Sequence, residues 1–254
     1  MPPAMPLIPS HVAALFAAYV LLVAAGLVAG VHAAGRSPRL TGGVAVGLLA
    51  WLAASGALAR RGALLDWSAV PPRFAIVVLP PLLFAAALAF TPLADRVLRV
   101  TPPGWPIAAQ TFRVGVEALL WLLSVHGAVA PLMTFHGRNF DVLTGLTAPV
   151  AAWLCFGGGR RRTGLALAWN AVGLALLVNV VTHGILSTPA PFQLFHTTPP
   201  NTIVARFPTV WLVSFFVPLA FALHALSIRQ IVRGLAVPVT SGGGTRARLS
   251  ATIR

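Results

Sequence analysis

Seven apolar segments, each near the length of a membrane span, dominate this chain of 254 residues. The predicted spans are residues 11–32, 41–59, 74–90, 107–130, 141–157, 164–186 and 208–228. A helix of about 20 apolar residues crosses the hydrocarbon core of a bilayer. The sequence therefore predicts an all-α fold, a polytopic membrane helix bundle of about seven transmembrane helices within residues 1–240.

The composition excludes a water-soluble domain and argues against nucleic-acid binding. Charged residues make up 9% of the chain, whereas soluble domains carry roughly a quarter. The net charge of +14 comes from arginines clustered between the apolar segments, with no lysine. Loops that flank membrane helices have this pattern, so we expect a lipid bilayer and no nucleic acid as partner. We expect a multi-pass protein of a bacterial cytoplasmic (inner) membrane.

The arginines also predict an orientation. With the N-terminus outside, the cytoplasmic side carries Arg36, Arg39, Arg96, Arg99, Arg160, Arg161, Arg162, Arg229, Arg233, Arg246, Arg248 and Arg254. The outer loops then carry Arg60, Arg61, Arg73, Arg138 and Arg206. Cytoplasmic loops of membrane proteins are enriched in basic residues, so the bias predicts an N-out, C-in bundle. Residues 241–254 are predicted to be a disordered cytoplasmic tail.

Two local features modify the simple bundle. Pro80 and Pro81 lie within the third span, and because proline lacks an N–H donor we expect the helix to kink or unwind there. Residues 91–106 form a longer inner loop in which apolar and charged residues alternate. This pattern predicts a short helix in the membrane interface, with Trp105 at headgroup depth.

The fourth predicted span contains the strongest candidate for chemistry. Gln110, Arg113 and Glu117 follow one another at spacings of three and four residues, so they share one helix face. Ionisable residues inside a membrane span are rare and often functional. Arg113 could keep Glu117 ionised. The pair is interpreted either as a structural ion pair between helices or as a proton relay, an acid–base pair or a substrate clamp.

A second polar cluster follows in the outer connection, with His136, Arg138, Asn139 and Asp141. Asn139 or Asp141 could cap the next helix, since an acid at a helix start suits the helix dipole. The alternative is a ligand pocket at the outer mouth of the bundle. Further candidates for that pocket are Asn179 and His183 on the sixth span and His196 in the loop after it.

We expect no cofactor and no metal site. His126 and His183 lie at comparable predicted depth, so an axial haem or metal pair is the alternative, but no spacing typical of metal ligands occurs. The absence of lysine excludes a retinal Schiff base. Cys155 is the single cysteine, which excludes an intramolecular disulfide, and we expect it to be a small core residue.

Two stretches in the middle of the chain resemble a pattern found in uncharacterised bacterial inner-membrane proteins of this size. They are Gln110–Trp121 (QTFRVGVEALLW) and Met133–Pro149 (MTFHGRNFDVLTGLTAP). The resemblance implies a multi-helix membrane fold and no established activity, so it assigns no catalytic residue.

Three functions are compatible with these features. The first is binding or transport of a small molecule through a polar pocket that faces the outer side. The second is a membrane-embedded enzyme for a lipid or isoprenoid-like substrate, with Glu117 or Asp141 as acid or base. The third is an accessory or scaffold subunit with a membrane-protein partner. Whether the chain is an enzyme stays open at this point.

Overall fold

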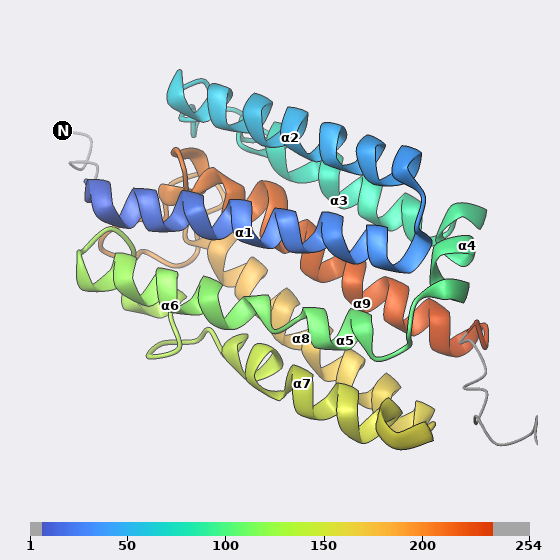
Figure 1. The fold of residues 1–254 in the computed structure, drawn as a ribbon. Coiled ribbons are helices and arrows are strands. Elements are labelled where there is room, and N and C mark those ends of the chain that lie inside the picture. The colour runs from blue at the N-terminus through green and yellow to red at the C-terminus, as the bar shows by residue number, and fades with distance from the viewer. Residues whose placement is uncertain (1–6, 236–254) are drawn as a thin grey trace, which may run out of the picture.

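The structure is a computed structural model that describes residues 7–235. Its regular structure over that range is helical (Figure 1). The all-α bundle expected from the apolar segments is confirmed. The predicted tail at 241–254, with its three arginines, lies outside the described residues, as does the end of the predicted 1–240 domain.

The helices follow the predicted spans closely. Their bounds are α1 Ser10–Gly35, α2 Pro38–Arg60, α3 Ala75–Ala89, α4 Pro92–Val100, α5 Trp105–Ala109, α6 Phe112–Val125, α7 Val142–Phe156, α8 Thr163–Leu186 and α9 Val217–Val232. A π-helix, η4 (Leu212–Phe216), leads directly into α9. Three short 3-10 turns complete the order: η1 Pro131–Met133, η2 Gly157–Gly159 and η3 Ile203–Ala205.

Six helical segments of the described chain are long and apolar enough to cross a membrane. They are Ser10–Gly35, Pro38–Arg60, Trp105–Val125, Val142–Gly159, Thr163–Leu186 and Leu212–Val232. A seventh is formed if α3 and α4 count as one span, bent by 71°. The chain is thus a multi-pass integral membrane protein.

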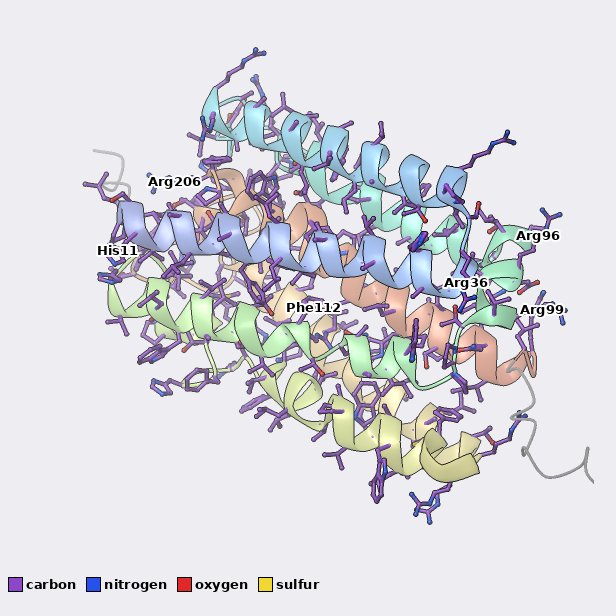
Figure 2. The ribbon with its side chains drawn as sticks, viewed as in Figure 1. His11, Arg36, Arg96, Arg99, Phe112 and Arg206 are labelled. Atoms are coloured by element: carbon purple, nitrogen blue, oxygen red, sulfur yellow. The ribbon has the colours of Figure 1, made fainter. Side chains whose placement is uncertain are left out.

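The helices run back and forth between two ends of the bundle. We call these the His11 end, where α1 begins, and the Arg36 end, where it finishes. Figure 2 shows His11 and Arg206 at one end and Arg36, Arg96 and Arg99 at the other. This arrangement follows from an antiparallel course of successive long helices (Figure 1).

The region around α3 differs from expectation in one respect. We expected the helix to kink or unwind at Pro80 and Pro81; α3 remains helical through both residues, so the second alternative, unwinding, is wrong. The sharp bend comes later, after Phe90, where Thr91 caps the next helix by accepting a hydrogen bond from the N–H of Ala94 at 3.2 Å. The short helix expected within residues 91–106 is present as α4. Its position in the membrane interface stays a prediction.

Small residues allow the helices to approach closely. Tyr19 of α1 lies over Gly115 of α6, where a Cβ atom would clash with its ring, and its hydroxyl donates to the carbonyl of Phe112 at 2.6 Å. At a second contact, Gly56 of α2 receives the Trp211 ring, whose Nε1 donates to the carbonyl of Leu52 at 2.9 Å. Close packing of this kind is typical of membrane helices.

The outer surface of the bundle is apolar while its interior holds polar groups. Leu22 (66% exposed), Leu83 (66%) and Phe84 (68%) face outward, whereas Gln110, Arg113 and Glu117 are at most 2% exposed. An apolar exterior suits lipid as its surroundings. The buried polar residues therefore need partners within the protein, and these partners define the candidate site.

Candidate functional site

Two glycines bring the helices of the site together. A Cβ atom on Gly145 of α7 would lie 2.8 Å from the backbone nitrogen of Val114, so α7 and α6 touch here. A Cβ atom on Gly173 of α8 would lie 2.5 Å from Cε1 of His224 in α9. Both positions therefore need a residue without a side chain. As a result α6, α7, α8 and α9 present their polar residues to one another.

Arg113 and Asp141 form the central ion pair, with 2.8 Å between Nε and Oδ2. Their side chains are 2% and 8% exposed. The sequence predicted Glu117, one turn along the same helix, as the partner of Arg113, whereas the structure joins α6 to α7 through Asp141. A buried ion pair of this kind links two helices, and each charge compensates the other inside a region of low dielectric.

Glu117 accepts a hydrogen bond from Asn139 instead. Asn139 Nδ2 lies 2.7 Å from Glu117 Oε1 and also donates to the carbonyl of Met133 at 3.0 Å. The Asn139 Oδ1 atom accepts from the backbone N–H of Asp141 at 3.1 Å, where α7 begins. Asn139 therefore supports the helix start, as one hypothesis expected, but capping by the Asp141 side chain is wrong because that carboxylate pairs with Arg113.

The polar chain continues from Arg113 into α9 and α8. Arg113 Nη1 lies 3.2 Å from His224 Nε2, and His224 Nδ1 lies 2.9 Å from Asn170 Oδ1. Because a guanidinium group only donates, His224 Nε2 is the acceptor, and Nδ1 carries the proton that Asn170 accepts. Asn170 Nδ2 then donates to Ser227 Oγ at 3.0 Å and to the carbonyl of Ala166 at 2.8 Å.

Gln110 lies at the break between α5 and α6, next to the same network. Its Nε2 atom donates to the carbonyl of Ala220 in α9 at 3.1 Å, and the side chain is fully buried. The sequence placed Gln110 on the face that carries Arg113 and Glu117, and all three are buried in the bundle. The helix break itself was not predicted, since nothing in the apolar pattern marks it.

A central cavity of about 70 Å³, the space open to the centres of water-sized molecules, lies beside this network. Arg113, Glu117 and Asp141 line it together with a mainly apolar wall. The lining continues toward the His11 end, as far as Thr188 and Asn201. A space of this size exceeds what a single water molecule needs.

Apart from the ion pair between Arg113 Nε and Asp141 Oδ2, each charged residue on the cavity wall keeps one atom without a partner among the described residues. These atoms are Arg113 Nη2, Glu117 Oε2 and Asp141 Oδ1. Buried polar atoms in native proteins are almost always paired, so unpaired ones mark a place where another molecule can bind. The charged residues of the wall thus offer one donor and two acceptors to an occupant of the cavity, and the unpaired Asn201 Oδ1 adds a further acceptor toward the His11 end.

The remaining predicted site residues do not join this network. Asn179 Nδ2 donates to the carbonyl of Arg138 at 2.8 Å, and the ring of His183 stacks on Phe195 at 4.8 Å between centroids. His136 and His196 are exposed in loops at the His11 end. These residues belong to the same end of the bundle but not to the buried site.

The two histidines of the haem alternative contact other rings. His126 lies edge-on against His11 at 5.2 Å between centroids, while His183 has Phe195 as its ring neighbour. Within residues 7–235, no group of three or more His, Cys, Asp or Glu side chains is arranged to hold a metal. Cys155 is fully buried between apolar neighbours, as expected.

The sequence did not identify His224, Asn170 and Ser227 as members of the site. Each is an isolated polar residue in an otherwise apolar helix, and their partners are 54 or more residues away in the chain. The usable signal was His224, an ionisable residue inside a membrane span. A spacing pattern within one helix cannot identify such partners, because the contacts form only when helices pack.

Comparison with known proteins gives a family but no activity. No curated protein and no solved structure matches the chain significantly. Residues 70–232 match the family described as "Domain of unknown function (DUF8737)", and this range covers more than half of the chain and the whole buried network from Gln110 to Ser227. The chain therefore belongs to the DUF8737 family.

Proposed function

We propose that this membrane protein binds a small molecule in the central cavity, which the ligand enters from the His11 end. The observation that carries the proposal is the set of three unpaired atoms on Arg113, Glu117 and Asp141, all residues of the cavity wall. A wall that is apolar apart from a few convergent polar groups is typical of small-molecule sites. Transport would be the same binding step followed by release at the other end.

The proposed orientation places the cavity on the outer side of a bacterial cytoplasmic membrane. Nine described arginines gather at the Arg36 end: Arg36, Arg39, Arg96, Arg99, Arg160, Arg161, Arg162, Arg229 and Arg233. Five lie at the His11 end: Arg60, Arg61, Arg73, Arg138 and Arg206. Since cytoplasmic loops carry the excess of basic residues, this distribution supports N-out, C-in and an outward-facing pocket.

The chemistry of the wall defines the ligand class. Glu117 Oε2 and Asp141 Oδ1 can accept hydrogen bonds, Arg113 Nη2 can donate one, and the remaining surface is mainly apolar. A matching ligand has a compact apolar body and one head group rich in donors, such as an amine or a hydroxyl group. Two carboxylates against one guanidinium favour a cationic head group over an anionic one.

Benzylamine tests this ligand class. Toluene, which has the same ring but no amine, is the matched control compound. We expect benzylamine to raise the thermal unfolding temperature of the purified protein in detergent in a concentration-dependent way, because a ligand that binds the folded state stabilises it. Toluene should give a smaller shift. The substitution Glu117→Gln, which keeps shape and removes the charge, should reduce the benzylamine shift.

The matched control is Asp66→Asn, which removes a carboxylate from an exposed loop pair with Arg73. This variant should respond to benzylamine as the parent protein does. Equal shifts with benzylamine and toluene in the parent protein would contradict a role for the carboxylates. No shift with any compound of this class would contradict the proposal itself.

One observation supports an enzyme as the second candidate. Glu117 and Asp141 line the same cavity and each keeps one unpaired oxygen, so a substrate there would meet two carboxyl groups. An acid and a base on one substrate is the arrangement that general acid–base catalysis needs. Incubation with an isoprenoid alcohol or its phosphate, followed by mass spectrometry, distinguishes the two: turnover lost in both Glu117→Gln and Asp141→Asn supports the enzyme.

A further inference from the structure

A second hollow, which shares no lining residue with the central cavity, lies at the Arg36 end between α5 and α7. This cleft has a volume of about 340 Å³. Its lining consists of Pro102, Pro103, Gly104, Trp105, Ala108, Ala152, Trp153, Phe156, Gly157, Arg160 and Arg161. The lining residues come from the start of α5, the end of α7 and the turn into α8. The cleft therefore lies where the helices emerge, at the level of the arginine-rich loops.

The turn after α7 places positive charge over the cleft. Gly158 and Gly159 have φ values of 60° and 78°, a region that favours glycine, and they reverse the chain within three residues. The Arg162 N–H then donates to the Cys155 carbonyl at 3.0 Å, which holds the turn against the end of α7. The sequence Gly-Gly-Gly-Arg-Arg-Arg thus folds its arginines back toward the helix they follow.

Arg160 and Trp153 form one wall of the cleft. The guanidinium carbon of Arg160 lies 4.7 Å from the Trp153 ring centroid, a cation–π contact. Gly157 lies under the same ring, since a Cβ atom there would come within 2.7 Å of Trp153 Cδ1. The Trp153 ring therefore packs against both Gly157 and the Arg160 guanidinium, and it holds that guanidinium beside the cleft.

Two exposed tryptophans flank the cleft, Trp105 at 43% and Trp153 at 59%. Tryptophan gathers at the boundary between hydrocarbon and headgroups, because its ring is apolar and its N–H is polar. Ala108, Ala152 and Phe156 add apolar surface to the lining. The lining of the cleft thus combines basic and apolar groups, as a lipid molecule combines a head group with acyl chains.

We propose that this cleft binds an anionic phospholipid. Arg160 and Arg161 contact the phosphate, which guanidinium groups bind through paired hydrogen bonds, and the acyl chains lie along α5 and α7. Arg160 and Arg161 are the charged residues among the described residues of the lining, so the lining itself contributes positive charge. This charge selects an anionic lipid over a zwitterionic one. The proposal does not depend on a ligand in the central cavity.

Native mass spectrometry of the purified full-length chain tests the proposal. The protein is delipidated in detergent and titrated with phosphatidylglycerol or, separately, phosphatidylcholine. We expect one phosphatidylglycerol to bind with at least about 10-fold preference over phosphatidylcholine. The double variant Arg160→Gln with Arg161→Gln should lose about 10-fold in phosphatidylglycerol affinity.

The matched control is Arg36→Gln with Arg39→Gln, which removes two charges from the same end of the bundle but outside the cleft. This control should change phosphatidylglycerol affinity by less than about 2-fold. An equal loss in both double variants would overturn the proposal, because it would show diffuse attraction by the basic surface. Displacement of the lipid by millimolar inorganic phosphate would also overturn it, in favour of a site for soluble anions.

Brominated phosphatidylglycerol gives a second measurement that does not depend on the arginines. Bromine quenches nearby tryptophan fluorescence, so bound lipid should quench Trp105 and Trp153. The double variant Trp105→Phe with Trp153→Phe should lose the part of the quenching that saturates at one lipid per protein. If the saturable quenching stays unchanged in that variant, the lipid binds elsewhere and the proposal fails.

Discussion

Arg113 Nε and Asp141 Oδ2 lie 2.8 Å apart in the interior of the bundle, and this ion pair joins α6 to α7. Asp141→Asn should lower the free energy of unfolding by about 3–5 kcal/mol, because it leaves the Arg113 charge buried without its partner. Unfolding in mixed micelles of dodecyl maltoside and SDS measures the loss. The double variant Arg113→Met with Asp141→Leu should regain most of it, and a double variant as unstable as the single one would contradict a pairwise role.

Gly173 is expected to determine the position of His224. Gly173→Ala places a Cβ atom against the His224 ring and should destabilise the fold by about 1–3 kcal/mol through overpacking. Gly164→Ala is the control in the same helix, since no atom lies within 4 Å of the Cβ position there. In thermal unfolding in detergent, Gly173→Ala should have a clearly lower melting temperature than Gly164→Ala. Similar melting temperatures would show that α8 and α9 can move apart without loss of stability, which would contradict the prediction.

Asn170 is expected to connect His224 to Ser227. Asn170→Leu removes the acceptor for the His224 Nδ1 proton and the donor to Ser227. Leaving buried polar groups unpaired costs about 1–3 kcal/mol in unfolding free energy. The imidazole ¹⁵N spectrum of labelled protein gives a second check, because the parent should show a neutral ring protonated at Nδ1 and the variant should lose that single form.

The central cavity should admit water-soluble reagents. In a Cys155→Ala background, Val181→Cys lines the cavity, whereas Val178→Cys lies on the outer face of the same helix and is 51% exposed there. A charged thiol reagent should modify Val181→Cys and leave Val178→Cys intact in membranes, since lipid covers the latter. Benzylamine should slow the reaction at Val181→Cys. Modification of the outer position alone would contradict a water-accessible cavity.

The same background tests the orientation of the chain. Arg61→Cys is an exposed position directly after α2, at the His11 end. Arg96→Cys is an exposed position at the Arg36 end (Figure 2). With the N-terminus outside, a membrane-impermeant thiol reagent added to intact cells should label Arg61→Cys, and Arg96→Cys should react only after the cells are broken. Labelling of Arg96→Cys in intact cells, with Arg61→Cys reacting only after the cells are broken, would show that the N-terminus faces the cytoplasm.

The spans could be predicted because each depends on local composition. The α8 helix runs from Thr163 to Leu186, within one residue of the prediction at its start and at its end. Features that depend on packing were missed, including the break at Gln110 and the π-helix that begins at Leu212. At the π-helix, the carbonyl of Ser214 accepts from Trp51 Nε1 at 2.9 Å, a contact between residues far apart in the sequence.

The candidate site was predicted in part for the same reason. Arg113 and Glu117 stand out within one helix as ionisable residues in an apolar segment. The choice of Asp141 over Glu117 as the partner of Arg113 depends on the approach of α7 at Gly145, which no spacing in the sequence reveals. Asn139 was expected either to cap a helix or to line a pocket. Its Oδ1 atom accepts a hydrogen bond at the start of α7, and its Nδ2 atom donates one to Glu117.

The hydrogen bond from Arg113 to His224 has a consequence for proton movement along the buried chain of polar residues. A guanidinium group keeps its protons under physiological conditions, so it cannot hand one on and take another. Arg113 therefore separates two groups of residues. The carboxyl groups of Glu117 and Asp141 lie toward the His11 end, and the imidazole of His224 lies on the other side with Asn170 and Ser227. A proton therefore cannot pass between the carboxyl groups and the imidazole through this residue.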